Sequence, residues 1–368
     1  MRVAHVSTFP PLKCGIASFA TDLIGAIPNF HNLKYSLHYG IIGQENYHGN
    51  ANVNSPESLI ELAKLISNSD CDIVSLQHEF GIWGGRDGEN IFYFLDNLSK
   101  PILSILHTTF GPMIKKPIQQ EIINRLIDRS TCVVLLTDFA KLTTEKLLGR
   151  QIKNIVVIPH GIPDYEYRDP PELSKNDTLL PLRLITPGFF REDKGIEMVL
   201  LALRQLKLKG YNILYKIAGE PQGQFPNQIS YHARIENLID SIGLRSIVEV
   251  DARYLPLDEQ VSAIQESHVG IFAYQNQSQS SSGTIPLVLS LGRPVLCTPF
   301  EYAKSKEDFG VTLTTDFDHL SIADAIEKFM ARKEYLDITR DIYKNTRAWT
   351  WNKVGIAFST EYKRIIKK

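Results

Sequence analysis

Short apolar runs alternate with helical segments along almost the whole chain, and no other feature of the sequence constrains the fold as strongly. The strand-like runs, rich in β-branched residues, cover Val3–Ser7, Ile73–Gln77, Ile102–Leu106, Cys132–Leu136, Ile155–Ile158, Arg183–Thr186, Ile213–Ala218, Val248–Asp251, Val269–Ala273, Val295–Cys297 and Val311–Leu313. Helix-like segments between them include Ser58–Ile66, Ile118–Ile127, Gly195–Lys209 and Tyr231–Ile242. This alternation predicts an α/β fold with parallel sheets and helices on both faces.

A proline-rich and charged segment, Ile162–Pro181, interrupts the pattern near the middle of the chain. It holds four prolines and shows no period, which is typical of a linker. Each half begins with a strand that runs into a glycine-bearing turn, at Gly15 and at Gly188. A chain of 368 residues is about two domains long, so the sequence predicts two Rossmann-like, doubly wound domains. We expect a ligand cleft between the C-terminal edges of their sheets.

The balance of charges and the cysteines narrow the class of protein. The chain has 40 basic and 41 acidic residues and a formal net charge of −1, which argues against a general nucleic-acid binder. Its four cysteines are widely separated and none has metal-ligand spacing, so we expect buried thiols in a reducing compartment. The N-terminus enters a strand without a signal peptide, and no apolar stretch approaches the ~20 residues of a spanning helix. These features predict a cytoplasmic protein.

Two segments of the second half have the features of an anion site. Ser282–Thr284 follows a strand-like run and a polar loop, and it opens an apolar helix. The unpaired N–H groups and the dipole at such a helix start favour a phosphate. Gly188–Gly195 lies between a strand and a helix, and its Arg191 and Lys194 could point at a diphosphate. Either segment alone is as often a structural turn, but together they favour phosphate binding.

Polar side chains follow three strands of the first half. His78 and Glu79 precede a glycine-rich loop with Trp83, and His107 and His160 each follow a strand in the same manner. A His-Glu pair before such a loop suits a site that grips a polar ring. One histidine at a strand end is more often structural than catalytic, whereas three at one sheet edge indicate a site. Zinc is an alternative ligand here, although no HxH or HExxH spacing supports it.

Other chemistries find less support in the sequence. No G-x-S-x-G elbow is present for Ser/His/Asp hydrolysis, and no pair of carboxylates marks a glycosidase cleft. Lys115 and Lys116, beside Met113 and Ile114, could touch an anionic membrane surface, although a solvated helix start is the simpler interpretation.

The order of the motifs resembles that of the retaining glycosyltransferases of family 4, which have the two-domain GT-B fold and use nucleotide sugars. The matching pieces of the first half are Pro11-Leu-Lys-Cys-Gly15, His107 and Val157-Ile-Pro-His-Gly161. Those of the second half are Gly188…Lys194-Gly195, Ile217-Ala-Gly219 and Ser282-Gly-Thr…Gly292-Arg-Pro-Val295. The resemblance spans nearly the whole chain and implies that the aromatic helix Ala348–Ile366 crosses back onto the first domain. We therefore expect domains at 1–165 plus 346–368 and at 166–345.

The resemblance also implies roles for individual residues. Lys194 matches the lysine that contacts the donor diphosphate, and His107 matches a histidine that touches the donor sugar. The expected catalytic residues are His107, Arg191 and Lys194. The expected donor-binding residues are Gly15, Gly188, Glu220, Arg253, Tyr254, Gln279, Ser282, Gly283 and Thr284, with Arg253 and Tyr254 at the base. The expected acceptor-binding residues are His78, Glu79 and Trp83.

The chain departs from the family in its acidic residues. Two glutamates separated by seven residues are usual, but Gln279 and Leu287 stand at those positions. Leu287 cannot bind ribose hydroxyls, so another group must do so. Phe189 replaces the arginine that usually follows the glycine, and Arg191 could reach the same phosphate. These changes indicate a divergent subgroup.

The resemblance implies a metal-independent hexosyltransferase that acts with retention on a hydroxyl of a glycan or lipid-linked glycan. UDP-glucose is the first expected donor, on family frequency, and GDP-mannose is the second. No cofactor and no nucleic acid are expected beyond this co-substrate. The expected pathway is envelope or exopolysaccharide synthesis in the cytoplasm, with weak contact at the inner membrane face. Two alternatives stay open: an inactive nucleotide-sugar-binding protein, favoured by the missing glutamates, and a GT-B epimerase.

Overall fold

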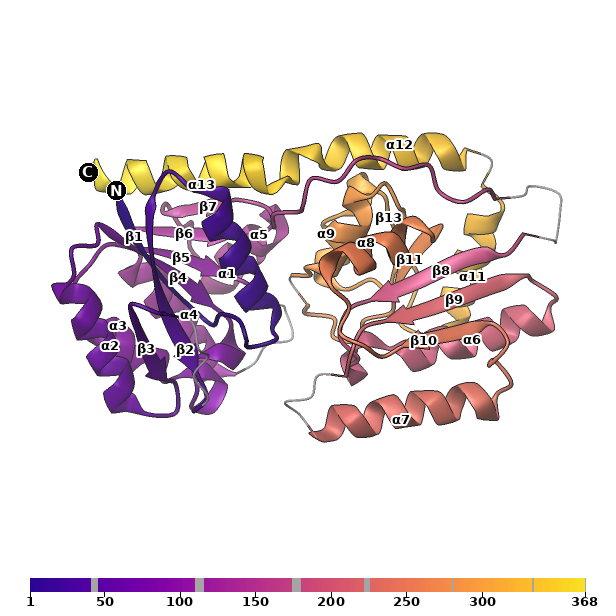
Figure 1. The fold of residues 1–368 in the computed structure, drawn as a ribbon, viewed down its shortest axis with the longest axis horizontal. Coiled ribbons are helices and arrows are strands. Elements are labelled where there is room, and N and C mark those ends of the chain that lie inside the picture. The colour runs from indigo at the N-terminus through magenta and orange to yellow at the C-terminus, as the bar shows by residue number, and fades with distance from the viewer. Residues whose placement is uncertain are drawn as a thin grey trace. The chain divides into compact units, whose positions relative to one another are not determined.

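The computed structural model describes residues 1–40, 46–109, 116–173, 180–221, 226–279, 281–332 and 334–367 (Figure 1). The chain divides into two compact units, Met1–Gly161 with Ala348–Lys368, and Ile162–Arg347. Each unit has its own parallel sheet with helices packed against it, so the prediction of a two-domain α/β fold is confirmed. In the described part of the chain, no helix is both long and apolar enough to cross a membrane. The basic segment Met113–Lys115 lies outside the described residues.

The first unit holds a seven-stranded sheet in the order β3-β2-β1-β4-β5-β6-β7. Its strands are β1 (Arg2–Ser7), β2 (His31–His38), β3 (Gly49–Asn52), β4 (Ile73–His78), β5 (Ile102–Leu106), β6 (Cys132–Leu135) and β7 (Ile155–Val157). Its helices are α1 (Gly15–Ala26), α2 (Pro56–Asn68), α3 (Ile91–Asn97), α4 (Pro117–Arg129), α5 (Asp138–Leu148) and α13 (Trp351–Ile366), with 3-10 turns η1 (Phe80–Ile82) and η2 (Arg86–Gly88).

Helices α1 and α13 cover one face of this sheet. Leu23 of α1 and Phe358 of α13 are fully buried in the same cluster as Val3 and Ile105 of the sheet. The hydroxyl group of Tyr362 on α13 also bonds to Ser75 of β4, at 2.8 Å. The C-terminal helix therefore returns to the first unit, as the resemblance implied. Helices α2, α3 and α4 supply the core on the other face.

The second unit holds a six-stranded sheet in the order β10-β9-β8-β11-β12-β13. Its strands are β8 (Leu182–Pro187), β9 (Ile213–Ala218), β10 (Val248–Asp251), β11 (Val269–Phe272), β12 (Val295–Cys297) and β13 (Val311–Leu313). Its helices are α6 (Ile196–Leu208), α7 (Pro226–Ser241), α8 (Leu257–Gln265), α9 (Thr284–Ser290), α10 (Glu301–Lys304), α11 (His319–Met330) and α12 (Tyr335–Thr346). The 3-10 turns η3 (Glu192–Lys194) and η4 (Glu307–Phe309) lie in this unit, and η5 (Arg347–Trp349) leads into α13.

The strand order reverses once in each sheet, beside its first strand. β1 lies between β2 and β4, and β8 lies between β9 and β11, with all of these pairs parallel. Connections on the two sides of such a strand leave toward opposite faces, which opens a crevice at the carboxyl ends of the strands. The backbone topology of each unit therefore provides a crevice in which a ligand can bind.

Two strands of the first unit, β2 and β3, were not among the predicted strands. In β2 the buried residues Leu33, Tyr35 and Leu37 alternate with polar ones, so the run lacks the continuous apolar character of its neighbours. The polar side chains of β2 also make contacts: Asn32 bonds to the imidazole of His5 at 2.9 Å. Contacts of this kind, with residues far away in the sequence, determine that the segment forms a strand. The sequence of the segment itself does not reveal them.

The segment 162–173 has the composition of a linker but packs on the second unit. The guanidinium group of Arg293, which is fully buried, donates a bond to the backbone oxygen of Arg168 at 3.0 Å. The same group also bonds to three further backbone oxygens, those of Ser267, Leu291 and Gln265. Tyr167 bonds to Thr339 of α12 at 2.8 Å. The bonds to Arg293 and Thr339 therefore hold the segment 162–173 on the second unit, although its prolines and charges predicted a linker.

Candidate functional site

The reversal point of the second sheet lies between β8 and β11 and is lined by backbone. Gly188 follows β8 with a φ of 108°, a region that favours glycine. A Cβ atom added there would lie 3.0 Å from the methyl group of Thr284, so these two residues are in contact. A Cβ atom on Gly219, after β9, would overlap the backbone oxygen of Gly188. The glycines thus let three chain segments approach one another at the carboxyl edge.

The turn η3 brings Lys194 to the same edge. Gln275, which follows β11, donates its backbone N–H to the oxygen of Asp193 at 2.9 Å and ties the turn to that strand. Gly195 has a φ of 63°, and a Cβ atom there would overlap the backbone oxygen of Ala273. The ammonium group of Lys194 consequently lies over the ring of Tyr274, 3.7 Å from its centroid.

The two cations of the Gly188–Gly195 segment have different partners. The guanidinium group of Arg191 makes two bonds to the carboxylate of Asp193, at 2.8 and 2.6 Å, which offset its charge. No carboxylate of the described residues lies within 4.0 Å of the Lys194 ammonium group, whose contact is the aromatic ring. Lys194 therefore keeps a positive charge available for an anion, whereas Arg191 would have to leave Asp193 first.

The start of α9 supplies hydroxyl groups beside this charge. The hydroxyl oxygen of Thr284 lies 3.3 Å from that of Tyr274 and 3.3 Å from that of Ser282. Ser282 also accepts a bond from the backbone N–H of Ile285, at 3.3 Å. The rest of α9 is buried, so only its polar start, with Gly283 exposed, can meet a ligand. Tyr274 is 1% exposed and joins the hydroxyl groups to the cation.

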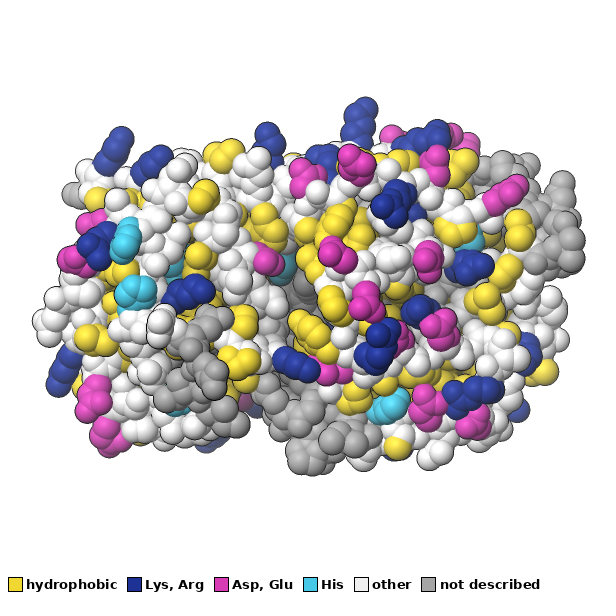
Figure 2. Space-filling view, viewed as in Figure 1, with side chains coloured by type: hydrophobic (Ala, Val, Ile, Leu, Met, Phe, Trp, Pro, Cys, Tyr) yellow, Lys and Arg dark blue, Asp and Glu magenta, His cyan; other side chains and the backbone are white. Residues whose placement is uncertain are grey.

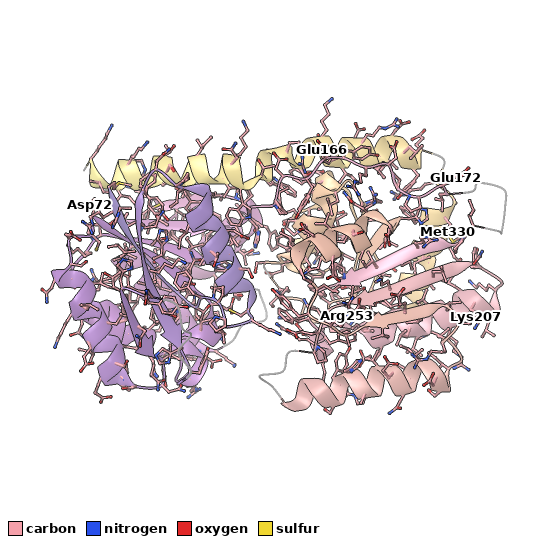
Figure 3. The ribbon with its side chains drawn as sticks, in the orientation of Figure 1. Asp72, Glu166, Glu172, Lys207, Arg253 and Met330 are labelled. Carbon is pink, nitrogen blue, oxygen red and sulfur yellow. The ribbon has the colours of Figure 1, made fainter. Side chains whose placement is uncertain are left out.

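The other expected donor residues lie at the edge strand β10 and in the loops that follow β9 and β11. Arg253 follows the edge strand β10, two strands from β8, which is about 10 Å at the usual strand spacing. Figure 3 labels Arg253 at the end of that strand, where its guanidinium bonds to Asp251 at 2.9 and 2.8 Å. Tyr254 is 52% exposed. Gln279 donates to the backbone oxygen of Ser281 at 2.7 Å, and the backbone oxygen of Glu220 accepts from Phe190 at 3.0 Å.

One carboxyl group of this region has no hydrogen-bond partner among the described residues. Glu301, at the start of α10, is 4% exposed, and neither of its carboxyl oxygens has a hydrogen-bond partner in the described structure. Burial raises the pKa of this group to about 7. Sequence reasoning did not select Glu301 or Tyr274 as functional. The only signal in the sequence is that each follows the end of a strand, β12 or β11, at the carboxyl edge.

The reversal point of the first sheet gathers neutral histidines. The Nε2 atom of His107 lies 2.7 Å from the amide oxygen of Gln77, and its ring meets that of Phe19 edge to face. Burial lowers the pKa of His107 to about 3, helped by nearby His160 and His78. Burial alone lowers the pKa of His78 to about 3, and neither of its ring nitrogens has a partner in the described structure. Both imidazoles are therefore uncharged at pH 7.

The remaining residues expected in the first unit differ in exposure. Glu79 caps η1 by accepting from the N–H of Phe80 at 3.1 Å, and it also accepts from the hydroxyl group of Thr108. Gly15 begins α1, and a Cβ atom added there would meet no atom within 4 Å. Trp83 is fully buried and donates its indole N–H to the oxygen of Gln77 at 3.1 Å. The structure therefore leaves no exposed face of Trp83 for a sugar.

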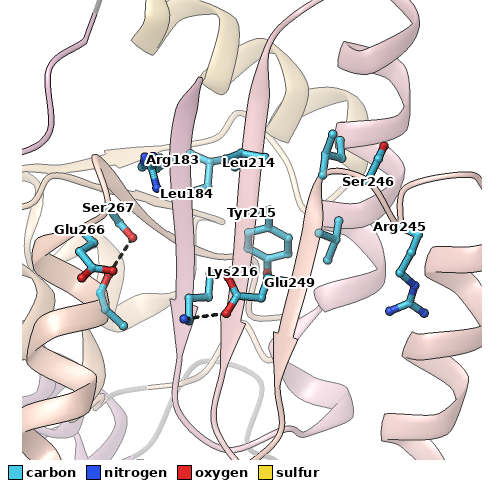
Figure 4. Close-up of a pocket in the computed structure, with 13 residues that line it drawn as sticks. Arg183, Leu184, Leu214, Tyr215, Lys216, Arg245, Ser246, Glu249, Glu266 and Ser267 are labelled. Carbon is cyan, nitrogen blue, oxygen red and sulfur yellow. Dashed lines mark hydrogen bonds and ion pairs between the residues drawn. The ribbon is translucent and has the colours of Figure 1, made fainter. Parts of the chain in front are cut away.

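No metal cluster occurs in the described part of the chain, and the charges on the visible face of the second unit are mixed (Figure 2). No three His, Cys, Asp or Glu side chains among the described residues could share a metal ion. Figure 2 shows Lys and Arg interspersed with Asp and Glu over the visible face of the second unit. A cavity of about 270 Å³ lies on β8, β9 and β10 (Figure 4), but the ion pair Lys216–Glu249, 2.8 Å long, lies within it. Its lining comes from the amino-terminal parts of these strands, the turn before β10 and the end of α8, and does not include Gly188.

Comparison with known proteins identifies the architecture. No protein-family model and no curated protein matches this sequence. Solved structures do match it over nearly its whole length. A sucrose-phosphate synthase from Thermosynechococcus elongatus has a TM-score of 0.77 at 13% identity and covers 100% of this chain and 99% of its own. Anabaena Alr3699/HepE in complex with UDP has a TM-score of 0.76 at 11% identity, over 99% of this chain and 100% of its own.

A glycosyltransferase from Rickettsia africae ESF-5 matches with a TM-score of 0.72 and 16% identity, covering 100% of this chain and 99% of its own. The chain has the GT-B fold. Within the second Rossmann-like unit of this GT-B protein, the residues that meet at the carboxyl edge are Gly188, Lys194, Thr284 and Tyr274. Arg191 is held by Asp193 instead.

Proposed function

We propose that this protein is a glycosyltransferase that moves a hexosyl group from a nucleoside-diphosphate sugar to a hydroxyl group of a glycan or lipid-linked glycan. The observation that carries the proposal is the Lys194 ammonium group, held 3.7 Å from the Tyr274 ring without a carboxylate partner in the described structure. Beside it are the Thr284 hydroxyl group and the glycine backbone at Gly188. A cation, hydroxyl groups and bare backbone at a sheet reversal point together suit a diphosphate.

In this reaction the site would stabilise the leaving diphosphate. As the bond between the anomeric carbon and the diphosphate oxygen breaks, negative charge grows on the diphosphate, and Lys194 and Thr284 would stabilise it. The acceptor oxygen bonds to the anomeric carbon, and its proton passes to the leaving diphosphate. This route gives retention and uses neither a protein nucleophile nor a metal. His107, whose pKa is lowered to about 3 by burial, would bind sugar hydroxyls as a neutral group.

UDP-glucose is the donor that we propose. Structures of the similar Anabaena Alr3699/HepE hold UDP and UDP-glucose, and a similar trehalose-6-phosphate structure from E. coli holds UDP-2-fluoro glucose. A saccharide acceptor, a cytoplasmic location and a place in envelope or exopolysaccharide synthesis complete the proposal.

The test compares Lys194 with a lysine of the same unit that has no role in the site. Lys207 lies near the far end of α6 (labelled in Figure 3), about 20 Å along the helix from Lys194. Calorimetry with UDP-, GDP- and ADP-sugars in EDTA identifies the donor. Slow nucleotide release without acceptor then reports turnover. We expect Lys194→Ala to lower the rate by about 10²–10³ and Lys207→Ala to leave it unchanged.

Two results would contradict parts of this proposal. Equal turnover of the Lys194→Ala variant and the wild-type protein would remove the role of the cation. Binding of a nucleotide sugar without release, even with a panel of saccharide acceptors, would instead favour an inactive nucleotide-sugar-binding protein.

A further inference from the structure

Glu301 is a buried acid for which the described structure supplies no partner. Its side chain is 4% exposed, and both carboxyl oxygens lack a hydrogen bond or ion pair in the described residues. Arg293, another buried ionisable residue of this unit, donates bonds to four backbone oxygens. A charged group buried without partners is costly, so a carboxyl group in this state indicates a ligand that would complete its bonds.

The backbone around Glu301 is joined to the loop that leads to the start of α9. The backbone N–H of Glu301 donates to the oxygen of Gln277 at 3.0 Å, and that of Tyr302 donates to the oxygen of Gln279 at 2.9 Å. Two main-chain bonds therefore fix α10 against residues 277–279. This loop continues to Ser282, whose hydroxyl oxygen lies 3.3 Å from that of Thr284.

Aromatic stacking makes a second connection to the proposed phosphate site. The ring of Phe300, the residue before Glu301, stacks on that of Tyr274 with centroids 4.9 Å apart and an interplanar angle of 22°. Thr298 donates its hydroxyl group to the backbone oxygen of Tyr274 at 2.7 Å. Tyr274 in turn carries the Lys194 ammonium group on its ring. The carboxyl group thus belongs to a residue built into the same edge of the sheet as the cation.

We infer that Glu301 binds hydroxyl groups of the nucleotide sugar and so helps to select the donor. The inference rests on the proposed function. A carboxyl group whose two oxygens lack partners in the described structure suits hydroxyl groups, because each oxygen accepts a bond from an O–H group. A raised pKa, about 7 here, adds a donor when the group is protonated. Neighbouring hydroxyls of this kind occur on the ribose of the nucleotide and on the transferred sugar.

The experiment measures dissociation constants by calorimetry for the wild-type protein and for Glu301→Ala and Glu301→Gln. The probes are UDP-glucose, UDP and 2′-deoxy-UDP, or the matching GDP or ADP compounds if the donor panel selects that base. Glu307→Ala is the control, because Glu307 is exposed on the turn η4 that follows α10. Thermal melting of each variant verifies that the second unit is folded.

We expect Glu301→Ala to weaken UDP-glucose binding about 10- to 100-fold, the usual effect of losing hydrogen bonds to a charged group. Glu301→Gln, which keeps one acceptor, should weaken it less. If the sugar is the partner, UDP binding is unchanged. If the ribose is the partner, Glu301→Ala weakens UDP binding as much as UDP-glucose binding. In that case 2′-deoxy-UDP binds the wild-type protein weakly, and Glu301→Ala changes its affinity little.

Failure of the inference is distinguishable from failure of the proposed function. If the wild-type protein binds UDP-glucose and both Glu301 variants bind it within twofold, Glu301 has no ligand role and the proposed function stands. If the wild-type protein binds no nucleotide sugar of the panel, both proposals are wrong.

Discussion

Replacing Glu301 by Gln should stabilise the ligand-free protein above the ordinary carboxyl pKa of 4.5, by an amount that grows as the pH rises to about 7. Burial raises the pKa of this carboxyl group from 4.5 to about 7, so the folded protein binds its proton more tightly than the unfolded chain. Below pH 4.5 both states are protonated and the group has no effect. As the pH rises toward 7, the folded protein must keep the proton or bury a charge, and the free energy of unfolding falls.

The size of the effect follows from the two pKa values. A tenfold change in a protonation equilibrium corresponds to about 1.4 kcal/mol, so the full difference between 4.5 and about 7 is worth at most about 3 kcal/mol. The amide of Gln has nearly the same shape and no charge. The variant should therefore exceed the stability of the wild-type protein by less than about 1 kcal/mol at pH 5 and by up to about 3 kcal/mol at pH 8.

Urea unfolding followed at several pH values between 5 and 8.5 measures this difference. The fluorescence transition of the second unit is fitted separately, because two-domain proteins need not unfold in one step. Glu307→Gln removes an exposed carboxylate from the adjacent turn and serves as the control. A stability difference for Glu301→Gln that does not change with pH would refute the reasoning, since it would show that the carboxyl group titrates alike in both states.

Substitutions at three further positions, Gly195, Arg293 and Tyr274, test other parts of the second unit. Gly195→Ala should destabilise the second unit by about 1–3 kcal/mol in urea unfolding, because its φ is 63° and the added Cβ atom would overlap the backbone oxygen of Ala273. Gly210→Ala is the control, because its φ is 84° but an added Cβ atom would meet no atom within 4 Å. The difference between the two variants separates backbone strain from overlap. Arg293→Met should cost at least about 3 kcal/mol in the same assay, because four backbone oxygens lose their donor. Tyr274→Phe should retain UDP affinity within about threefold by calorimetry, whereas Tyr274→Leu, which removes the ring beneath Lys194, should weaken it about tenfold.

Local patterns predicted the parts of the fold and of the candidate site that depend on neighbours in sequence. The apolar run at β9 was predicted over Ile213–Ala218, with the bounds that the structure gives, because a buried parallel strand is apolar at almost every position. The proximity of Gly188 to Thr284 followed from two strand–turn–helix units that meet at one edge of a sheet.

Features that depend on the three-dimensional path of the backbone could not be predicted from the sequence. Nothing in the sequence states that Asp193 would take the guanidinium group of Arg191, because the choice depends on the turn η3. Trp83 lies in a glycine-rich loop that suggested a site for a polar ring, yet its indole is fully buried and donates its N–H to the oxygen of Gln77. Glu301 has no hydrogen-bond partner among the described residues, and no local pattern in the sequence reveals this.

The anchoring of residues 162–173 by Arg293 also bears on how the chain responds to proteases. A protease must draw several residues of extended chain into its active site, so a peptide bond is cut readily only where the backbone can leave its neighbours. Around Tyr167 and Arg168 the backbone is bound to Arg293, and the Tyr167 side chain to Thr339. Trypsin should therefore cleave after Arg168 slowly in the native protein, and rapidly once Arg293 is replaced.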